Sequence, residues 1–544
     1  MKDRAQREGF FLALDVGTSS VKTGLFAADG SCYGRCRMPL RALSPRPGWS
    51  ELDLDGVWRI VAGSVRRVVA PSQAQSSIAG IGLSVTSPTV VVAGADDAPL
   101  SNGPTYSDTR ATSHLEGVRA RVGEEGYQRL TGNGLHLPLC SAATMLHLLD
   151  EARSSGCRPA KVGHLNSFIA ARLTGRWVMD WTNASYTGLV DLRSPGEWSG
   201  EACEALEFPE SLLPELVSPW EPIGCLSCEA ASELGLDPSV VVVAGAADTA
   251  CAAYAVGCAE DGDAFESCGT SGVLTVCHSR PPDNPLFMNR SHVLPGRWLS
   301  HGAMSAAGAA LRWLGEEVFH GLTDGSGSGE DYEWVNAEAR EAEPGSGGVV
   351  FLPYLFGERT PVWDPQARGA WVGISAATGR RHLVRAVLES TGYGIRQLLE
   401  IEESLHGRRV EEILVVGGGA RSRLWTQIKA DITGRRYLRS DEAEAACRGA
   451  AMLAAVGTGA YEDAWEAQRS LQMPEAEPVE PTSDPAVRAA YGRGYRVFSG
   501  LYPALKGLFG EGFFGGAGGD RQTRTGEDAN TNRNVAAGAL DRDA

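Results

Sequence analysis

The chain has 544 residues, 43% of them hydrophobic and 22% charged, a composition that is typical of a globular protein and excludes a disordered or fibrous one. Its formal net charge of −17 argues against nucleic acid or an anionic membrane surface as a partner, because both bind through a basic face. No apolar run approaches the ~20 residues that span a bilayer, and no signal-peptide pattern is present, so we expect a cytoplasmic protein without a membrane partner.

The first unit in chain order is a predicted β-hairpin. An apolar run, Phe10–Leu14, ends at Asp15, and a second run, Val21–Phe26, follows a short polar turn. A carboxylate at the end of such a strand can hold Mg²⁺ or its waters. In the turn, Gly17 allows an anion to approach the backbone closely, and Thr18 and Ser19 add two hydroxyl donors. Taken alone, this pattern is more typical of an ordinary hairpin turn than of a phosphate site.

Strands and helices alternate through the next segments. Trp58–Val69 and Ala143–Ala152 have the apolar spacing of helices. Ile78–Leu83 and Val90–Ala93 are predicted to form another pair of strands. This alternation predicts an α/β protein.

A second unit lies near the middle of the chain. A buried strand, Val240–Ala244, is followed by Asp248 and by a helix of small residues, Thr249–Val256. Further along, a tight loop that contains Gly269 and Thr270 precedes another strand. A carboxylate at a strand end faces a cleft more often than a core, because an unpaired buried charge is costly. The alternative is that Asp248 caps the helix, and the two roles are compatible.

The third unit is a glycine-rich turn between a strand and a helix. The apolar strand Glu411–Val416 is followed by three glycines, and a helix then begins near Ser422. Glycines in this position leave space for a flat or bulky ligand to contact the backbone. The spacing fits neither GxGxxG nor the phosphate-binding loop GxxxxGK[ST], so both of these common nucleotide-binding folds are disfavoured.

The first two units share a strand, a Gly-Thr-Ser turn and a second strand, once at Asp15 and once at Gly269. This repeat predicts two related α/β halves, split near Gly257, with a cleft between them. After about Leu508 the composition shifts to glycine and polar residues, which predicts a disordered tail at 510–544.

Three segments carry a resemblance to a known family. Gly369–Glu389 contains GAWVGI followed by HL and AVLE, and it resembles a signature of the FGGY carbohydrate kinases. Leu352–Pro361 (LPYLFGERTP) and Gly417–Ser422 (GGGARS) are similar to two further segments of that family. The resemblance extends from about Phe10 to about Leu501.

The resemblance implies two duplicated actin-like (ribonuclease-H-like) domains with an interdomain cleft. The N-terminal domain, 10–256, is then expected to bind the sugar and to carry the catalytic base. The C-terminal domain, 257–505, is expected to bind ATP. The implied reaction is ATP-dependent phosphorylation of a hydroxyl group, with Mg²⁺ as the second cofactor, because phosphoryl transfer needs positioning and a metal that neutralises charge.

The resemblance also implies roles for single residues. Asp248 is expected to be the general base that takes the proton from the attacking hydroxyl, and to hold the metal together with Asp15. The residues expected to contact ATP lie in the three turns and are Asp15, Gly17, Thr18, Ser19, Gly269, Thr270, Gly418, Gly419 and Ala420. The residues expected to contact the sugar are Ser87, Asp108, Asp248 and Thr249.

The substrate prediction depends on a few positions. Xylulose-specific members of the family usually carry Met-His, and glycerol kinases carry Arg-Glu, where this chain has Ser87-Pro88. Thr249 stands where xylulokinases usually have Asn. A hydroxyl-rich pocket suits a ketose or polyol, so we expect a ketopentose such as xylulose or ribulose, with gluconate, a tetritol or glycerol as alternatives.

Two other function classes are alternatives to a kinase. One is an actin-like or chaperone-like ATPase, and the GERTP segment with Glu389 favours a carbohydrate kinase over it. The other is an inactive sugar-binding regulator, which would be expected to have lost Asp15 or Asp248. The expected partner is therefore a small sugar or polyol, and the sequence is compatible with a homodimer.

Overall fold

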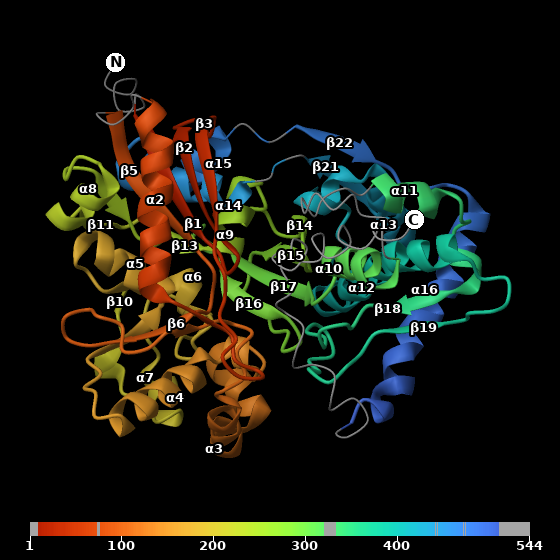
Figure 1. Cartoon of the computed structure of the whole chain (residues 1–544), viewed down its shortest axis with the longest axis horizontal. Helices are drawn as coiled ribbons and strands as arrows, with labels where there is room; N and C mark the ends of the chain where they lie inside the picture. Colours follow the sequence, from red (N-terminus) through yellow and green to blue (C-terminus); the bar gives the residue numbers. More distant parts are fainter. Residues whose placement is uncertain are drawn as a thin grey trace, which may run out of the picture.

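The computed structural model describes residues 9–72, 77–319, 333–440, 442, 444–471, 473 and 475–510. The predicted disordered tail, 510–544, lies outside these residues except for Gly510. Figure 1 shows two lobes side by side, each built around a β-sheet. Among the described helices, none is both long and apolar enough to cross a membrane.

The first lobe is built on a seven-stranded sheet of order β11-β12-β5-β1-β2-β3, in which β13 also pairs with β5. β1 is antiparallel to β2 and parallel to β5, which confirms the hairpin that the sequence predicts at the N-terminus. The strands are β1 (Phe10–Val16), β2 (Ser20–Ala27), β3 (Cys32–Pro39), β5 (Ile78–Val85), β11 (Pro222–Cys225), β12 (Val241–Val243) and β13 (Ala246–Ala247).

Strand β1 is buried on both faces, so its side chains alternate between two cores. Leu12 and Leu14 face a core that includes apolar residues of α2, α5 and α8. Phe11 and Ala13 face the other core, which includes α9. These helices are α2 (Leu54–Ser72), α5 (Leu165–Thr174), α8 (Cys228–Leu234) and α9 (Asp248–Ala255).

The remainder of the first lobe consists of further helices and three two-stranded sheets, β4–β7, β6–β8 and β9–β10. These strands are β4 (Glu51–Leu52), β6 (Val90–Ala93), β7 (Gly103–Pro104), β8 (Lys161–His164), β9 (Val178–Asp180) and β10 (Glu215–Val217). The helices are α3 (Thr112–Thr131), α4 (Ser141–Ser154), α6 (Trp181–Ala184) and α7 (Gly200–Ala205). The predicted pairing of Ile78–Leu83 with Val90–Ala93 is wrong. β5 is an inner strand whose two edges pair with β1 and with β12 and β13, so β6 pairs with β8 instead.

The second lobe repeats the topology of the first. Its seven-stranded sheet has the order β16-β17-β15-β14-β20-β21-β22. β14 is antiparallel to β15 and parallel to β20, as β1 is to β2 and β5, which confirms two related halves. The strands are β14 (Ala264–Cys268), β15 (Gly272–His278), β16 (Met288–Ser291), β17 (Trp298–Met304), β20 (Glu412–Val416), β21 (Arg436–Ser440) and β22 (Ala476–Val479).

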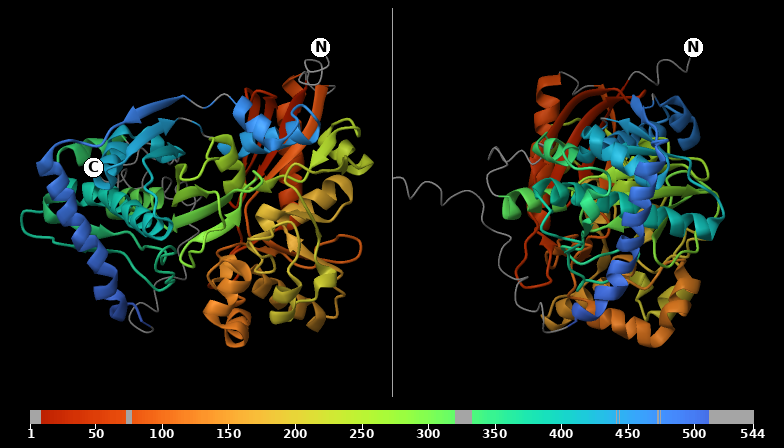
Figure 2. Two further views of the ribbon diagram at one scale, coloured as in Figure 1. Left: turned by 180° about the vertical axis from the view of Figure 1, so that it is seen from behind. Right: turned by 90° about the vertical axis from the view of Figure 1, so that its right-hand side faces the viewer.

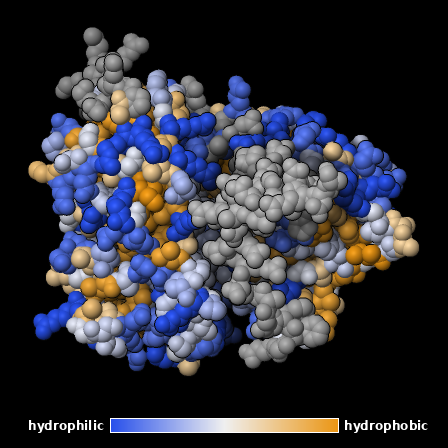
Figure 3. All heavy atoms as spheres, in the orientation of Figure 1, coloured by the Kyte–Doolittle hydropathy of each residue, from blue (hydrophilic) through white to orange (hydrophobic). Residues whose placement is uncertain are grey.

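The long helix α12 (Arg380–His406) contributes a row of buried residues to the core of the second lobe. A two-stranded sheet, β18 (Val350–Leu352) with β19 (Ala370–Val372), packs beside it. The other helices of this lobe are α10 (Gly308–Trp313), α11 (Glu333–Arg340), α13 (Arg423–Thr433) and α16 (Pro485–Leu505). On the face shown in Figure 3, hydrophilic side chains cover much of the described surface of both lobes.

Two helices near the C-terminus leave the second lobe and pack on the first. α14 (Ala445–Gly457) lies against β1, β5 and α9, and α15 (Ala464–Ser470) follows it (Figures 1 and 2). The Tyr461 hydroxyl donates to the Ala28 carbonyl at 2.7 Å, and the Tyr254 hydroxyl donates to the Ala464 carbonyl at 2.8 Å. The predicted range of the C-terminal domain, 257–505, stays a prediction; within it, α14 shares a core with Phe11 and Ala13 of the first lobe and with Phe265 and Val416 of the second.

Candidate active site

Asp15 and Asp248 lie at the same edge of the first sheet. In the parallel pairing, Ser84 of β5 stands opposite Asp15 of β1 on one side and Ala246 of β13 on the other. The carboxyl ends of parallel strands meet at one edge, where open α/β sheets bind their ligands. The Ser84 hydroxyl donates to Asp15 Oδ1 at 2.8 Å and fixes this buried carboxylate.

Lys22 is a neighbour of Asp15 that the sequence analysis missed. Its Nζ lies 3.2 Å from Asp15 Oδ2 and 3.5 Å from Glu444 Oε2, at the start of α14. Burial alone would lower the pKa of Lys22, but these two carboxylates outweigh it and raise that pKa, so the ammonium stays charged. The hairpin register could have revealed the contact, because Asp15 and Lys22 stand directly opposite each other in the β1–β2 pair.

Asp248 is the first residue of α9, and Ala247 precedes it as the N-cap. The hypothesis that Asp248 is itself the N-cap is therefore wrong. Its Oδ1 accepts the backbone N–H of Thr249 at 2.6 Å and the Thr249 hydroxyl at 3.0 Å. Burial raises the pKa of Asp248 and the charge of Asp15 adds to the rise, whereas Arg290 and Thr249 oppose it.

Arg290 comes from β16 of the second lobe and reaches the neighbourhood of Asp248. Its guanidinium lies over the ring of Tyr186, 4.0 Å from the ring centroid, and Nε donates to the Tyr186 hydroxyl at 2.6 Å. Arg290 is 3% exposed, and its Nη1 has no hydrogen-bond partner among the described residues. No local pattern in the sequence points to Arg290, because its contact with Tyr186 joins two distant parts of the chain.

The turn with Gly269 and Thr270 joins β14 to β15 in the second lobe. A side chain at Gly269 would meet no described heavy atom within 4 Å, so the backbone here is open to a ligand. The Gly269 carbonyl accepts the N–H of Gly308, and the Thr270 carbonyl accepts the N–H of Ala307, at 2.9 Å each. These bonds hold the turn against the start of α10. Thr18 and Ser19 of the corresponding β1–β2 turn are likewise not buried.

The glycine-rich turn after β20 is more tightly packed than the sequence suggests. A Cβ at Gly417 would lie 2.9 Å from the Cys268 carbonyl oxygen, and a Cβ at Gly419 would overlap the Cys268 sulfur. Gly419 and Ala420 are buried, and Gly418 is partly exposed. At least two of the glycines are therefore needed for packing against β14, and a ligand role for this turn stays a prediction.

The predicted sugar contacts Ser87 and Asp108 lie on neighbouring segments, which the isolated bridge between Thr89 and Thr105 brings together. The hydroxyls of Ser87 and Thr89 are buried without a hydrogen-bond partner among the described residues. Asp108 accepts the Ser50 backbone N–H at 2.7 Å, and the Arg110 side chain donates to both of its oxygens. Asp108 thus orients Arg110 and has less freedom than Ser87 to bind a ligand.

Glu358, in the LPYLFGERTP segment, is a further buried carboxylate, and the sequence alone assigned it no role. Its Oε1 accepts the N–H groups of Ser305 at 2.6 Å and of Arg359 at 2.8 Å, and Oε2 is buried without a partner. Burial raises the pKa of Glu358 to about 7, although these hydrogen bonds oppose the rise. It supports the loop before α10, which holds the Gly269 turn.

Two family models match this chain. Residues 10–255 match the N-terminal domain of the FGGY family of carbohydrate kinases, and residues 264–458 match the C-terminal domain of the same family. The chain belongs to the FGGY family of carbohydrate kinases. The resemblance in the sequence is thereby confirmed, and the protein is a carbohydrate kinase of a family that uses ATP and typically a divalent metal.

Curated relatives of this kinase have different names. A xylulose kinase of Lactococcus lactis is 30% identical over 461 residues, covering 83% of this chain and 89% of the relative. A gluconokinase of Bacillus subtilis is 27% identical over 455 residues, covering 83% and 88%. Glycerol kinases also match.

A solved xyloylose kinase from Brucella ovis is 29% identical and superimposes with a TM-score of 0.82, covering 92% of this chain and all of that one. The predicted class of two duplicated, actin-like α/β domains is thereby confirmed.

Proposed function

We propose that this kinase transfers the γ-phosphoryl group of ATP to a hydroxyl of a ketopentose of the xylulose or ribulose type. The observation that carries the proposal is the meeting of Asp15 and Asp248 at one sheet edge, with Arg290 of the second lobe beside Asp248. The first lobe supplies the base and the sugar contacts. The second lobe supplies the turns of Gly269–Thr270 and Gly418–Ala420 for ATP.

The residues present fit a nucleotide with Mg²⁺. The open backbone at Gly269 and the accessible Thr18 and Ser19 offer N–H and hydroxyl donors to phosphate oxygens. Asp15 offers a carboxylate oxygen of the type that Mg²⁺ prefers, and Asp248 lies near enough for their charges to interact. When bound, the metal neutralises phosphate charge. Lys22 adds a positive charge beside Asp15.

Asp248 then acts as the general base. Its Oδ1 is held by Thr249, which leaves Oδ2 without a hydrogen bond among the described residues and able to accept a proton. A raised pKa improves its basicity toward an alcohol, whereas the charge of Arg290 favours the carboxylate form. Thr249 fixes the direction in which the carboxylate points.

A ketopentose is favoured by the unpartnered hydroxyls of Ser87 and Thr89, which can each donate to and accept from a polyhydroxyl substrate. The xylulose kinase relative supports the same choice. One observation favours gluconate instead. The unpartnered Nη1 of buried Arg290 could pair with a carboxylate, and one relative is a gluconokinase.

A substrate panel tests this proposal. ADP release is measured with D-xylulose, D-ribulose, L-ribulose, gluconate, erythritol and glycerol, each with and without Mg²⁺. We expect the highest kcat/KM with one of the ketopentoses and no activity without a divalent metal. A preference for gluconate, erythritol or glycerol would refute the ketopentose assignment, and ADP release that no sugar stimulates would refute the reaction itself.

A further inference from the structure

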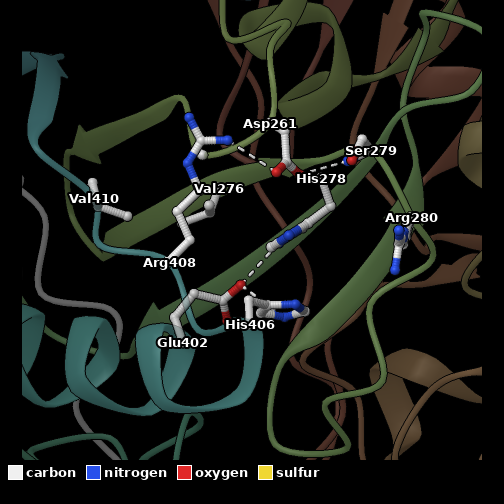
Figure 4. A pocket seen from close by; sticks show the side chains of 10 residues that line it. Asp261, Val276, His278, Ser279, Arg280, Glu402, His406, Arg408 and Val410 are labelled. Atoms are coloured by element: carbon white, nitrogen blue, oxygen red, sulfur yellow. Dashed lines mark hydrogen bonds and ion pairs between the residues drawn. The ribbon is translucent and has the colours of Figure 1, made fainter.

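Three potential metal ligands meet at the outer end of β15, at a distance from the Gly269 turn. His278 is the last residue of β15, whereas Gly272 next to the turn is the first, so about 20 Å of strand separates them. Glu402 and His406 lie one helical turn apart at the C-terminal end of α12 and share one face. Figure 4 shows the three side chains pointing toward one another in a pocket of about 250 Å³.

The distances within this cluster suit a small metal ion. Glu402 Oε1 lies 2.8 Å from His278 Nε2 and 3.3 Å from His406 Nε2, and one ligand atom from each residue falls within 4.8 Å of the others. Ligands at ~2.0–2.1 Å around a tetrahedral Zn²⁺ are about 3.3 Å apart. The three residues therefore need only a small outward movement to bind one ion.

Glu402 is not satisfied by the protein alone. It is 2% exposed, and neither of its oxygens makes a hydrogen bond within the described part of the chain, although both imidazoles lie within ion-pair distance of Oε1. A buried carboxylate without hydrogen bonds is costly unless a cation compensates it. The carbonyl end of a helix also favours positive charge, and α12 ends at His406.

The two histidines can offer lone pairs. His278 Nε2 also contacts the Ser300 hydroxyl at 2.9 Å. That hydroxyl can turn to Asn289 Oδ1, 3.3 Å away, and release the nitrogen for a metal.

We propose that His278, Glu402 and His406 form a site for Zn²⁺ or a similar divalent transition metal, separate from the nucleotide metal. Two imidazole nitrogens and one carboxylate suit Zn²⁺ rather than Mg²⁺ or Ca²⁺, which prefer oxygen ligands. Three protein ligands leave one position for water. The bound ion would tie the end of β15 to the end of α12, so its effect is to stabilise the second lobe.

The test uses the full chain, stripped with a chelator and free of nucleotide. Co²⁺ is added as a spectroscopic probe, Zn²⁺ is used to displace it, and the Tm is followed with each metal. We expect one Co²⁺ per chain with visible absorption bands, displacement by Zn²⁺, and a higher Tm with metal. Absence of Co²⁺ binding would overturn the proposal and leave the cluster a buried ion pair.

Variants identify the ligands. His406→Ala, Glu402→Gln and His278→Ala should each weaken Co²⁺ binding by at least about 10-fold, since even outer-shell changes cost that much. His406 is the least buried of the three, so its variant should fold even if the others do not. His382→Ala, at the other end of the same helix, is the matched control and should bind normally. Asp15→Asn should also retain this site. Unchanged Co²⁺ binding in folded His406→Ala would overturn the assignment.

Discussion

Asp248 is subject to opposing electrostatic effects: burial and Asp15 favour its protonated form, and Arg290 favours its carboxylate. If it is the base, Asp248→Asn keeps the shape and removes the ability to accept a proton. We expect kcat to fall by at least ~10², with little change in KM, as measured by steady-state ADP release. Added Mg²⁺ should not restore this variant, whereas it should partly restore Asp15→Asn. A kcat near that of wild type would refute the assignment.

Glu358 gives a prediction for pH and stability. Its pKa is about 7 in the folded protein and 4.5 for an ordinary glutamate, so the folded state holds the proton more tightly. The carboxyl thus favours folding below pH 4.5, and this contribution is lost as the pH rises toward 7. Relative to wild type, Glu358→Gln should gain about 3 kcal/mol in free energy of unfolding between pH 4.5 and pH 8.

Urea unfolding of wild type and Glu358→Gln across this pH range measures the effect. Glu316→Gln, which changes an exposed glutamate, is the control, and its free energy of unfolding should vary with pH in parallel with wild type. If the free energy of unfolding of Glu358→Gln also changes with pH in parallel with wild type, the carboxyl is ionised in the folded state without loss of stability.

Site residues that lie at the end of a strand can be recognised in the sequence. Site residues that reach the same place from distant segments of the chain cannot. Asp15 and Asp248 could be singled out because each follows an apolar run. Arg290 and Glu358 could not, because they reach the site through contacts with distant segments. The roles of the candidate residues stay predictions until the variants are measured.

At the scale of elements, helix α14 packs unusually closely on its neighbours. A Cβ at Gly449 would overlap the Cys251 carbonyl oxygen of α9, and a Cβ at Gly82 of β5 would overlap the Ala450 carbonyl oxygen. Backbone atoms cannot rotate away as side chains do. Gly449→Ala should therefore destabilise the protein by about 1–3 kcal/mol, despite the better helix propensity of alanine.

Gly492→Ala is the matched control for this helix contact. Gly492 lies in α16, and an added Cβ there meets no described heavy atom within 4 Å. This control should stabilise the protein by up to about 1 kcal/mol. Equal shifts for the two variants in urea unfolding would argue against tight packing at Gly449.

The strand–turn–strand units could be predicted because their apolar runs are continuous and end at polar turns. Strand pairing could not be predicted in the same way for β5 and β6. Adjacency in the chain favoured a hairpin, but β5 finds partners on both of its edges, including strands far along the chain. The register of non-local pairs depends on the whole sheet.

At the scale of the whole molecule, Phe509 marks the C-terminal limit of the core of the second lobe. This residue is 7% exposed and belongs to the core of the second lobe. The tail predicted from composition, 510–544, therefore begins directly after this core residue, and we expect it to be dispensable. Deletion of 511–544 should leave ADP release and Tm unchanged, whereas deletion of 507–544 also removes Phe509 and should cost up to about 3 kcal/mol. Equal Tm values for the two truncations would contradict this boundary.

Because α14 and α15 pack on the first sheet, we expect that residues 1–256 do not form a self-sufficient folding unit. A fragment that stops at residue 256 lacks the alanine-rich helix covering Phe11 and Ala13, so that apolar face would be open to water. We expect fragment 1–256 to aggregate when expressed alone and to become soluble when co-expressed with fragment 257–510. Sedimentation of each fragment, alone and together, measures this. A soluble 1–256 fragment that unfolds cooperatively would show that the first lobe folds without α14 and α15.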